Sequence, residues 1–212
     1  MLHAAYGPLP RRARTDPLDA LVNTILSQNT SDVNSDRAFA ALRAAFADWA
    51  AAAETAPRVI AECIRSGGLA NVKSVRIIRV LQAIRAREGA VSLRRLRRMR
   101  TPAVMEYLLS LEGVGIKTAC CVLLFALGRP VMPVDTHVFR VTRRLGWIGL
   151  DVPVDDVHTL LEPHIPPQLV LPLHLYLIEH GRHTCHPRNP ACPTCCLAAR
   201  CRARREGWAS RA

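Results

Sequence analysis

The sequence predicts an all-α protein. Apolar residues recur three and four positions apart through most of the 212 residues, whereas no stretch alternates for long enough to indicate a half-buried strand. Half of the residues are apolar but only 5% are aromatic, so Leu, Ala, Val and Ile must fill most of the core. A chain of this length can bury a sizeable core as one large domain or as two small lobes.

The N-terminal half is expected to contain three main helices. The pair Asp16-Pro17 looks like an N-cap and a first helical residue, and apolar residues follow at helical spacing over 18–26. A second helix is predicted over 32–46. The pair Gly67-Gly68 then interrupts the chain before a long amphipathic helix over 71–88.

The C-terminal half is predicted to continue with shorter helices. Residues 92–100 read SLRRLRRMR, a short amphipathic helix whose basic face is either solvated or in contact with DNA. Further helices are predicted over 101–111, 116–127, 135–145, 154–161 and 171–181. The basic tail after Cys201 is expected to be frayed.

The chain is strongly basic, with a formal net charge of +12 and a pI of about 10.2. Such a surface attracts polyanions, and nucleic acid is the first candidate; an anionic membrane or simple solubility is the alternative. No apolar run reaches the ~20 residues that span a bilayer. Residues 1–14 lack the apolar stretch of a signal peptide. We therefore expect a soluble, cytoplasmic monomer, nucleoid-associated if bacterial, that does not bind membranes.

A glycine-rich turn separates two of the predicted helices. The segment from Leu108 to Leu124 reads LLSLEGVGIKTACCVLL, with Gly113-Val114-Gly115 between two apolar stretches. Glycine permits positive φ and the close approach of a second backbone. The N–H groups that lead into a helix can hold a phosphate. The pattern indicates a helix–hairpin–helix element that binds DNA, with an ordinary helical corner as the alternative.

Lys117 and Asp135 are the candidate catalytic residues. Lys117 begins the second helix of the hairpin, where the positive end of the helix dipole disfavours the ammonium form and favours a nucleophilic amine. An ordinary surface lysine is the alternative. Asp135, in the segment PVDTHVFRV, is expected to cap the helix that follows it. Its carboxylate could also stabilise positive charge that develops on a sugar.

Five of the eight cysteines lie close together in the sequence. Cys185, Cys192, Cys195 and Cys201 have the spacing C-x6-C-x2-C-x5-C. In a cytosolic chain such a group is more often a metal site than a set of disulfides. Four thiolates can hold an iron–sulfur cubane or a zinc ion, and the single C-x2-C unit is unlike the paired units of common zinc sites.

The remaining cysteines are expected to be core residues. Cys196 is taken as a core thiol, with substitution for Cys195 as the alternative. Cys63, Cys120 and Cys121 lie on apolar helical faces. Within the cysteine segment, Arg188 is either a phosphate contact or a solvated loop residue.

Taken together, these elements resemble the endonuclease III family of helix–hairpin–helix DNA glycosylases. LEGVGIKTA resembles the family hairpin L-P-G-V-G-x-K-T-A, and PVDTHVFRV resembles V-D-T-H-x-x-R-V. ILSQNTSD, from Ile25 to Asp32, resembles L-S-x-Q-x-T-D. The cysteine spacing resembles that of the family's [4Fe–4S] loop. The resemblance runs from about Leu18 to Cys201.

The resemblance implies a two-lobed architecture. A six-helix lobe would span 15–124 and carry the hairpin, and a discontinuous iron–sulfur lobe would combine 1–14 with 125–212. A cleft between the lobes would hold Lys117 and Asp135. The [4Fe–4S] cluster, held by the four cysteines, would be structural and would position a DNA-facing loop.

The resemblance also implies an activity in base excision repair. The protein would extrude a damaged nucleotide from double-stranded DNA and remove oxidised pyrimidines. Lys117 would form a Schiff base, Asp135 would be the catalytic aspartate, and the abasic strand would be cleaved by β-elimination. The expected DNA contacts are Gln28, Asn29, Asp32, Leu69 (the apolar wedge), Gly113, Val114, Gly115, His137 and Arg188.

Several positions depart from the family pattern. Asn29 occupies the place of the family glutamine that enters the DNA stack, and Gln28 comes one residue earlier, so either could probe the duplex. Ala70 stands where a tyrosine is usual, and Glu112 where a proline is usual. A monofunctional mismatch glycosylase and a non-enzymatic DNA-binding protein are the alternative functions. Lys117 argues against the first alternative, and the pair of Lys117 and Asp135 argues against the second.

Overall fold

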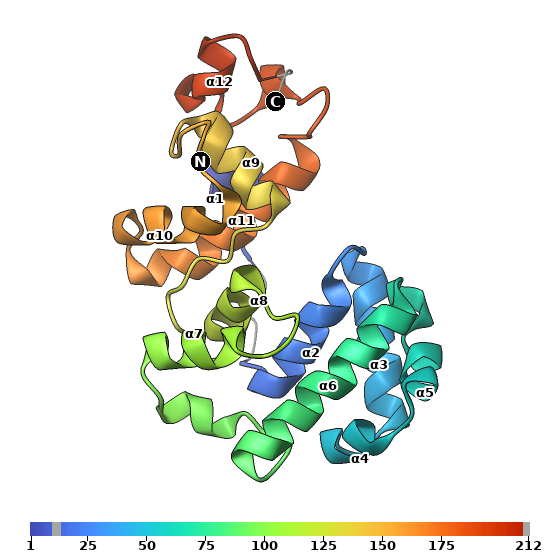
Figure 1. Cartoon of the computed structure of the whole chain (residues 1–212). Helices are drawn as coiled ribbons and strands as arrows, with labels where there is room; N and C mark the ends of the chain where they lie inside the picture. Colours follow the sequence, from blue (N-terminus) through green and yellow to red (C-terminus); the bar gives the residue numbers. More distant parts are fainter. Residues whose placement is uncertain (10–13, 210–212) are drawn as a thin grey trace. The chain divides into compact units, whose positions relative to one another are not determined.

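Every regular element in the described part of the chain, residues 1–9 and 14–209 of a computed structural model, is a helix (Figure 1). The all-α prediction is therefore confirmed. The chain forms two compact units, Arg14–Arg129 and the combination of Met1–Ala13 with Pro130–Ala212. Residues 10–13 of the expected N-terminal segment lie outside the described residues, as do residues 210–212 of the tail.

The unit Arg14–Arg129 is built around the long helix α6. Its helices are α2 (Pro17–Ser27), α3 (Asp32–Ala45), α4 (Trp49–Glu54), α5 (Pro57–Cys63), α6 (Ala70–Glu88), α7 (Thr101–Leu109) and α8 (Ile116–Cys121). α6 packs against α4 and α5, while α2 packs against α3 and α8 (Figure 1). The apolar faces of α2 and α6 supply much of the buried core.

Local sequence explains where the long helices begin and end. The Asp16 carboxylate accepts the Leu18 N–H at 2.9 Å, and Pro17 is the first residue of α2, as predicted. Gly89, with φ of 73°, ends α6 in the left-handed conformation that glycine adopts without a steric penalty. Residues 125–129 belong to this unit, since the Arg129 N–H donates to Leu123 O at 2.8 Å.

Some short elements differ from the prediction. α4 and α5 were not expected; the Asp48 carboxylate caps α4, and Pro57 begins α5. The basic segment 92–100 forms only a 3₁₀ turn, Arg94–Arg98, although Leu93 and Leu96 are fully buried, as an amphipathic segment requires. After α8 the chain continues as a π-helical turn, Val122–Ala126, instead of one helix to residue 127.

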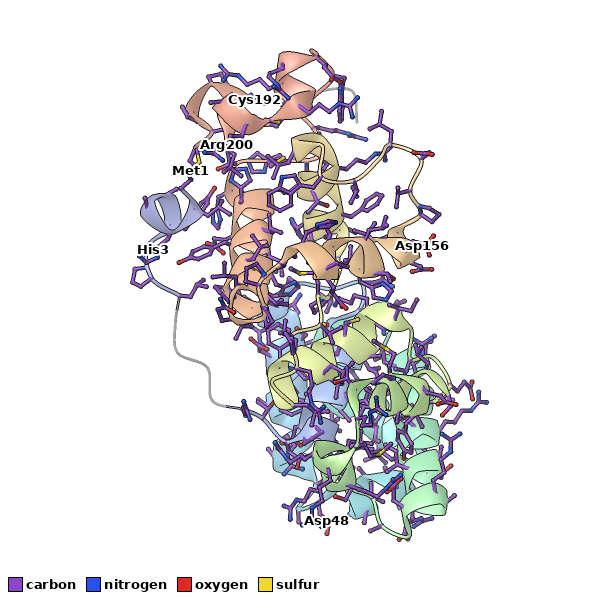
Figure 2. All side chains as sticks on the ribbon, turned by 90° about the vertical axis from the view of Figure 1, so that its left-hand side faces the viewer. Met1, His3, Asp48, Asp156, Cys192 and Arg200 are labelled. Carbon is purple, nitrogen blue, oxygen red and sulfur yellow. The ribbon has the colours of Figure 1, made fainter. Side chains whose placement is uncertain are left out.

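The second unit contains α1 (Leu2–Tyr6), α9 (Thr136–Leu145), α10 (Val157–Leu161), α11 (Val170–His183) and α12 (Arg202–Arg205). α11 packs against both α9 and α1. The Tyr176 hydroxyl of α11 donates to Gly7 O at 2.9 Å, which attaches the end of α1. Figure 2 shows His3 on α1, with Met1 directly before this helix, and Cys192 and Arg200 in the C-terminal segment.

The expectation of a frayed tail after Cys201 was wrong for residues 202–209. They form α12 and a closing turn in which the Trp208 N–H donates to Ala203 O at 3.0 Å. Ala203 and Ala209 are buried, and Arg202 packs against Gly146, where a Cβ would meet its Cδ at 2.8 Å.

Within residues 1–9 and 14–209, no helix is both long enough and apolar enough to cross a membrane.

Candidate functional site

The hairpin turn between α7 and α8 is held by its backbone. Gly113 adopts φ of 76°, which favours glycine, and the Val114 N–H donates to Leu111 O at 3.1 Å. Val114 is buried, whereas Gly113 and Gly115 are exposed. Gly115 is the N-cap of α8 and its carbonyl accepts the Ala119 N–H. The exposed part of the turn is therefore backbone.

Lys117 is the second residue of α8 and is half-buried. The next residue, Thr118, is buried, and its hydroxyl accepts a hydrogen bond from Gln28 Nε2 at 3.3 Å. Gln28 Oε1 accepts from Arg76 Nη1 at 2.7 Å. Gln28 is thus held between α6 and α8, next to the candidate nucleophile.

Asn29 and Leu69 are exposed and have left-handed backbone conformations, with φ of 54° and 48°. A non-glycine residue in this region is strained, and such strain concentrates at functional positions. Leu69 is 56% exposed although it is a large apolar side chain. Asp32, the first residue of α3, is also exposed. Together with Gln28, the C-cap of α2, they place four of the expected DNA contacts at the ends of α2, α3 and α6.

Asp135 lies in the second unit as the N-cap of α9. Its Oδ1 accepts the Val138 N–H at 2.7 Å, and its carbonyl accepts the Phe139 N–H at 2.9 Å, so the predicted capping is confirmed. The residue is half-buried, and within residues 1–9 and 14–209 no hydrogen-bond donor reaches its other carboxylate oxygen. One oxygen serves the helix, and the second is left for other chemistry.

His137 belongs to α9 and packs against α11. Gly181 of α11 lies against it so closely that a Cβ at that position would meet His137 Cβ at 2.8 Å. His137 Nδ1 is 3.1 Å from Arg140 Nη2. Burial, with a smaller contribution from Arg140, lowers the pKa of His137, although Asp135 opposes the shift. The imidazole is therefore kept neutral near neutral pH.

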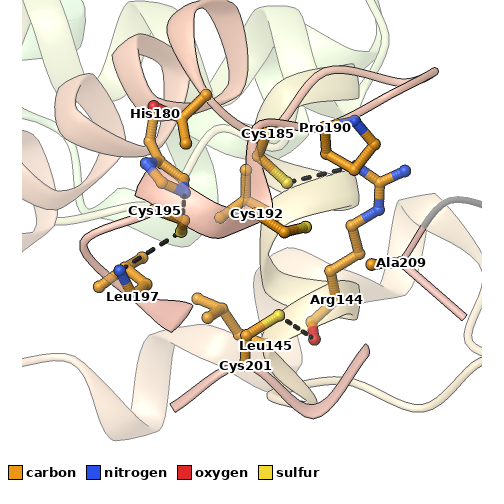
Figure 3. Close-up of a pocket in the computed structure, with 12 residues that line it drawn as sticks. Arg144, Leu145, His180, Cys185, Pro190, Cys192, Cys195, Leu197, Cys201 and Ala209 are labelled. Carbon is orange, nitrogen blue, oxygen red and sulfur yellow. Dashed lines mark hydrogen bonds between the residues drawn. The ribbon is translucent and has the colours of Figure 1, made fainter. Parts of the chain in front are cut away.

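The four predicted cysteine ligands line one pocket in the second unit (Figure 3). Besides Cys185, Cys192, Cys195 and Cys201, its lining is mainly apolar and includes Val141, Leu145, Pro190, Leu197 and Ala209. Cys196 is not among the lining residues, which separates it from Cys195. No three His, Cys, Asp or Glu side chains within 1–9 and 14–209 converge as ligands of a single metal ion would.

The surroundings of Cys195 in this pocket affect both the protonation and the orientation of its thiol. Burial raises the pKa of the Cys195 thiol and so favours its neutral form; a cation bound at the sulfur would offset this by stabilising the thiolate. His180 Nε2 lies 3.6 Å from Cys195 Sγ, and the Tyr6 hydroxyl lies 2.8 Å from His180 Nδ1. A neighbour that orients a thiolate is typical of metal centres.

Two arginines of α9 hold the cysteine segment, and the sequence analysis missed both. Arg144, 2% exposed, donates to His186 O at 2.6 Å and to Pro187 O at 2.9 Å. Arg140 donates to Cys185 O and Gly181 O, each at 2.8 Å. The helix that Asp135 caps therefore also fixes the cysteine loop. In the sequence, Arg140 and Arg144 stand one helical turn apart, which indicates a shared helix face but does not reveal the groups that they bind.

Arg188 and Asn189 are exposed at the end of this loop, and Asn189 has φ of 50°. Of the other cysteines, Cys120 and Cys121 are buried as predicted, whereas Cys63 and Cys196 are only partly buried. Lys117, Gln28, Asn29 and Leu69 thus belong to one unit. Asp135, His137, Arg188 and the cysteine pocket belong to the other.

Comparison with known proteins shows the class of protein to which this chain belongs. Residues 22–167 match the HhH-GPD superfamily of base excision DNA repair proteins. The chain is 34% identical to an endonuclease III of Thermotoga maritima over 88% of its own length and 83% of the relative's. It is 39% identical to a protein of Arabidopsis thaliana named as a DNA glycosylase, over 78% of its own length but only 56% of that relative's.

A solved structure extends the comparison to the fold. The trapped endonuclease III–DNA covalent intermediate in an estranged-adenine complex is matched with a TM-score of 0.80, at 27% identity, over 97% of this chain and 93% of that one. The fold and the sequence together define a helix–hairpin–helix enzyme of the DNA glycosylase/AP lyase class. The chain belongs to the HhH-GPD superfamily and, within it, is of the endonuclease III type.

Proposed function

We propose that this protein is a bifunctional DNA glycosylase that removes oxidised pyrimidines from duplex DNA and cleaves the resulting abasic site. The observation that carries the proposal is the position of Lys117, half-buried in the first turn of α8 directly after the glycine hairpin. A monofunctional glycosylase has no need of an amine at that position. The endonuclease III relative supports the same activity.

Lys117 acts as the nucleophile. Its neutral amine attacks C1′ of the extruded nucleotide, and the glycosidic bond breaks with its electron pair passing to the base, which takes up a proton. The sugar ring then opens to a Schiff base between Lys117 and C1′. This imine acidifies C2′; loss of a C2′ proton and departure of the 3′ phosphate complete β-elimination. Water finally hydrolyses the imine and restores Lys117.

Asp135 supplies a negative charge to the same reaction. Its carboxylate stabilises the positive charge that develops on the sugar as the base departs, and it assists proton transfer to or from the attacking amine. The free carboxylate oxygen supports this role, since the other oxygen is occupied by the Val138 N–H. The N-cap contact holds the side chain in one orientation.

The four cysteines would hold a [4Fe–4S] cluster. The pocket fits such a group: four sulfurs from one short segment line it and the rest of the lining is largely apolar. When bound, the cluster joins the two ends of the Cys185–Cys201 segment and contributes folding free energy. Arg188 and the exposed end of the loop then contact a DNA phosphate.

The protein is basic, and it binds double-stranded DNA through backbone N–H groups of its own chain. The hairpin Gly113-Val114-Gly115 contacts a phosphate through its two exposed glycines, since the Val114 N–H already donates to Leu111 O. Asn29 and Leu69 occupy the space that the extruded nucleotide leaves. Gln28 is already bonded to Arg76 and Thr118, so Asn29 is the residue that probes the duplex. Oxidised pyrimidines stack poorly and are easier to extrude.

Borohydride trapping tests the nucleophile. Purified protein is mixed with duplexes that carry an oxidised pyrimidine, an abasic site or no lesion, and borohydride reduces any imine to a stable covalent adduct. We expect an adduct on the two lesion duplexes and none on intact DNA. The Lys117→Ala variant, which retains the hairpin, is expected to bind the same duplexes without forming an adduct.

The outcomes separate the alternative functions. Base release without an adduct would replace the proposal with a monofunctional glycosylase. DNA binding with neither base release nor adduct would indicate a non-enzymatic binding protein. Metal analysis of the same preparation distinguishes iron and acid-labile sulfide from zinc, which is colourless.

A further inference from the structure

The first turn of α6 carries a buried lysine that none of the proposed reaction steps uses. Lys73 is only 2% exposed. Its Nζ donates to Leu26 O at 2.6 Å and to Gly67 O at 2.7 Å. These two carbonyls belong to segments far apart in the sequence: the end of α2, and the 3₁₀ turn before α6. One ammonium group therefore ties two loops together.

Each of these loops ends in a strained residue. Asn29 comes three residues after Leu26, and Leu69 comes two residues after Gly67, and both have positive φ. The only other non-glycine residue with positive φ among residues 1–9 and 14–209 is Asn189. Leu69 caps α6 without a side-chain hydrogen bond and is exposed, so its own side chain does little to hold the conformation. Strain of this kind persists only where the surroundings impose it.

A lysine is an unusual choice for this buried position. Burying a charge is unfavourable unless it is paired or hydrogen-bonded, and the next turn of α6 buries the apolar Ile77 and Ile78. Charge-assisted hydrogen bonds to two carbonyls are short and strong, which offsets this desolvation only while both carbonyls stay in place. The burial of Lys73 is therefore coupled to the geometry of both loops.

In the next turn of α6, Arg76 connects the end of α2 to the hairpin. Arg76 donates to Gln28 Oε1 at 2.7 Å, and its side chain lies against Gly113, where a Cβ would collide with the guanidinium. Glycine at 113 thus provides the room that Arg76 needs. The start of α6 therefore contacts three of the segments that are proposed to meet DNA: the end of α2, the turn before α6 and the hairpin.

We propose that Lys73 is a positioning residue whose two carbonyl hydrogen bonds hold Asn29 and Leu69 as one rigid pair, ready to enter the duplex when the damaged nucleotide leaves. This inference rests on the proposed function. Lys73 touches neither the sugar nor the base. It removes the free-energy cost of ordering the two loops at the moment of extrusion. Asn29 and Leu69 are accordingly expected to act together, so that loosening one loosens the other.

The test separates extrusion from chemistry. In Lys73→Met, a side chain of similar length replaces the ammonium. We expect the single-turnover rate on a duplex with a paired lesion to fall roughly 10- to 100-fold, as for other losses of positioning. A single-stranded abasic oligonucleotide needs no extrusion, and its cleavage and borohydride trapping should change little. Ile84→Ala, a cavity variant in the same helix, is the control for lost stability, and it should affect both substrates alike.

Hydrogen exchange gives a readout that does not depend on activity. Amides of residues 27–30 and 68–71 should lose protection together in Lys73→Met, and not in Ile84→Ala. If Lys73→Met does not fold, Lys73→Gln replaces it, since its amide can still donate to at least one carbonyl. An equal loss on both substrates, or loosening of one loop alone, overturns the inference. A wild-type protein that forms no adduct refutes the proposed function instead, while the exchange result still reports on Lys73.

Discussion

Asp135 combines a structural and a chemical role in one side chain. One oxygen caps α9 through the Val138 N–H, and the proposed reaction uses the negative charge. Asparagine caps helices about as well as aspartate but is uncharged. The two roles can therefore be separated by substitution.

We expect Asp135→Asn to fold with nearly wild-type stability and to lose roughly 100-fold or more in single-turnover excision, as when a stabilising charge is removed. Asp135→Ala should show the same loss of rate and also lose about 1 kcal/mol of unfolding free energy, because the cap is gone. Chemical denaturation and single-turnover kinetics measure the two effects. An active Asn variant would remove Asp135 from the proposed mechanism.

Because His137 is partly buried, we expect the free energy of unfolding to depend on pH. Burial depresses its pKa in the folded state below the ordinary 6.5, so the unfolded chain binds the proton more tightly. The stabilisation is complete above pH 6.5 and is lost as the pH falls toward the folded pKa. Urea unfolding across this range should show a shallower pH slope in His137→Gln than in wild type. Identical slopes would mean that His137 does not titrate differently on folding.

At the scale of an element, α9 joins the capped aspartate to the cysteine pocket. Arg140 and Arg144 lie one turn apart on this helix, and their guanidinium groups bind the carbonyls of Gly181, Cys185, His186 and Pro187. The planar guanidinium presents several donors at once, which a lysine cannot do. The loop is thus attached to the helix through its backbone as well as through its cysteines.

Arg144→Met leaves two carbonyls of the cysteine segment without their donors, which costs about 1–3 kcal/mol. In a chain of this size each kcal/mol lowers Tm by about 2–4 °C. We also expect less iron per protein, because Cys185 Sγ loses its contact with Arg144 Nη1, which lies 3.3 Å away. Thermal unfolding measures the loss of stability, and iron analysis measures the loss of iron. Arg200 is an exposed arginine of the same segment, so Arg200→Met is the matched control. Equal iron content in the two variants would contradict this role of Arg144.

At the scale of the whole molecule, the formal charge of +12 predicts the strength of non-specific DNA binding. Each phosphate contact releases counterions, so the logarithm of the affinity should fall linearly with the logarithm of the salt concentration. For 6–10 contacts the loss is roughly 10³- to 10⁵-fold between about 50 and 200 mM salt. Fluorescence anisotropy with an undamaged duplex measures the slope. An affinity that salt leaves unchanged would contradict binding through the phosphate backbone.

Much of the helical architecture could be predicted because its signals are local. α2 has its cap, its proline and its apolar spacing within eleven residues, and the hairpin glycines stand between two apolar stretches. Short elements such as α4, α5 and α12 escaped prediction. Each buries only one to three side chains, such as Ala203 in α12, against other parts of its unit. Local spacing does not encode such partners.

The sequence by itself determined the all-α class, the hairpin, the capping of α9 by Asp135 and the four cysteines as one group. These features rest on nearest-neighbour chemistry, in which turn glycines, caps and spacing act over a few residues. Only the tertiary structure decided that Lys73 joins Leu26 to Gly67, and that Arg144 holds the loop after Cys185. Their partners are backbone carbonyls, which every residue type carries, so no residue letter marks them and only folding selects them.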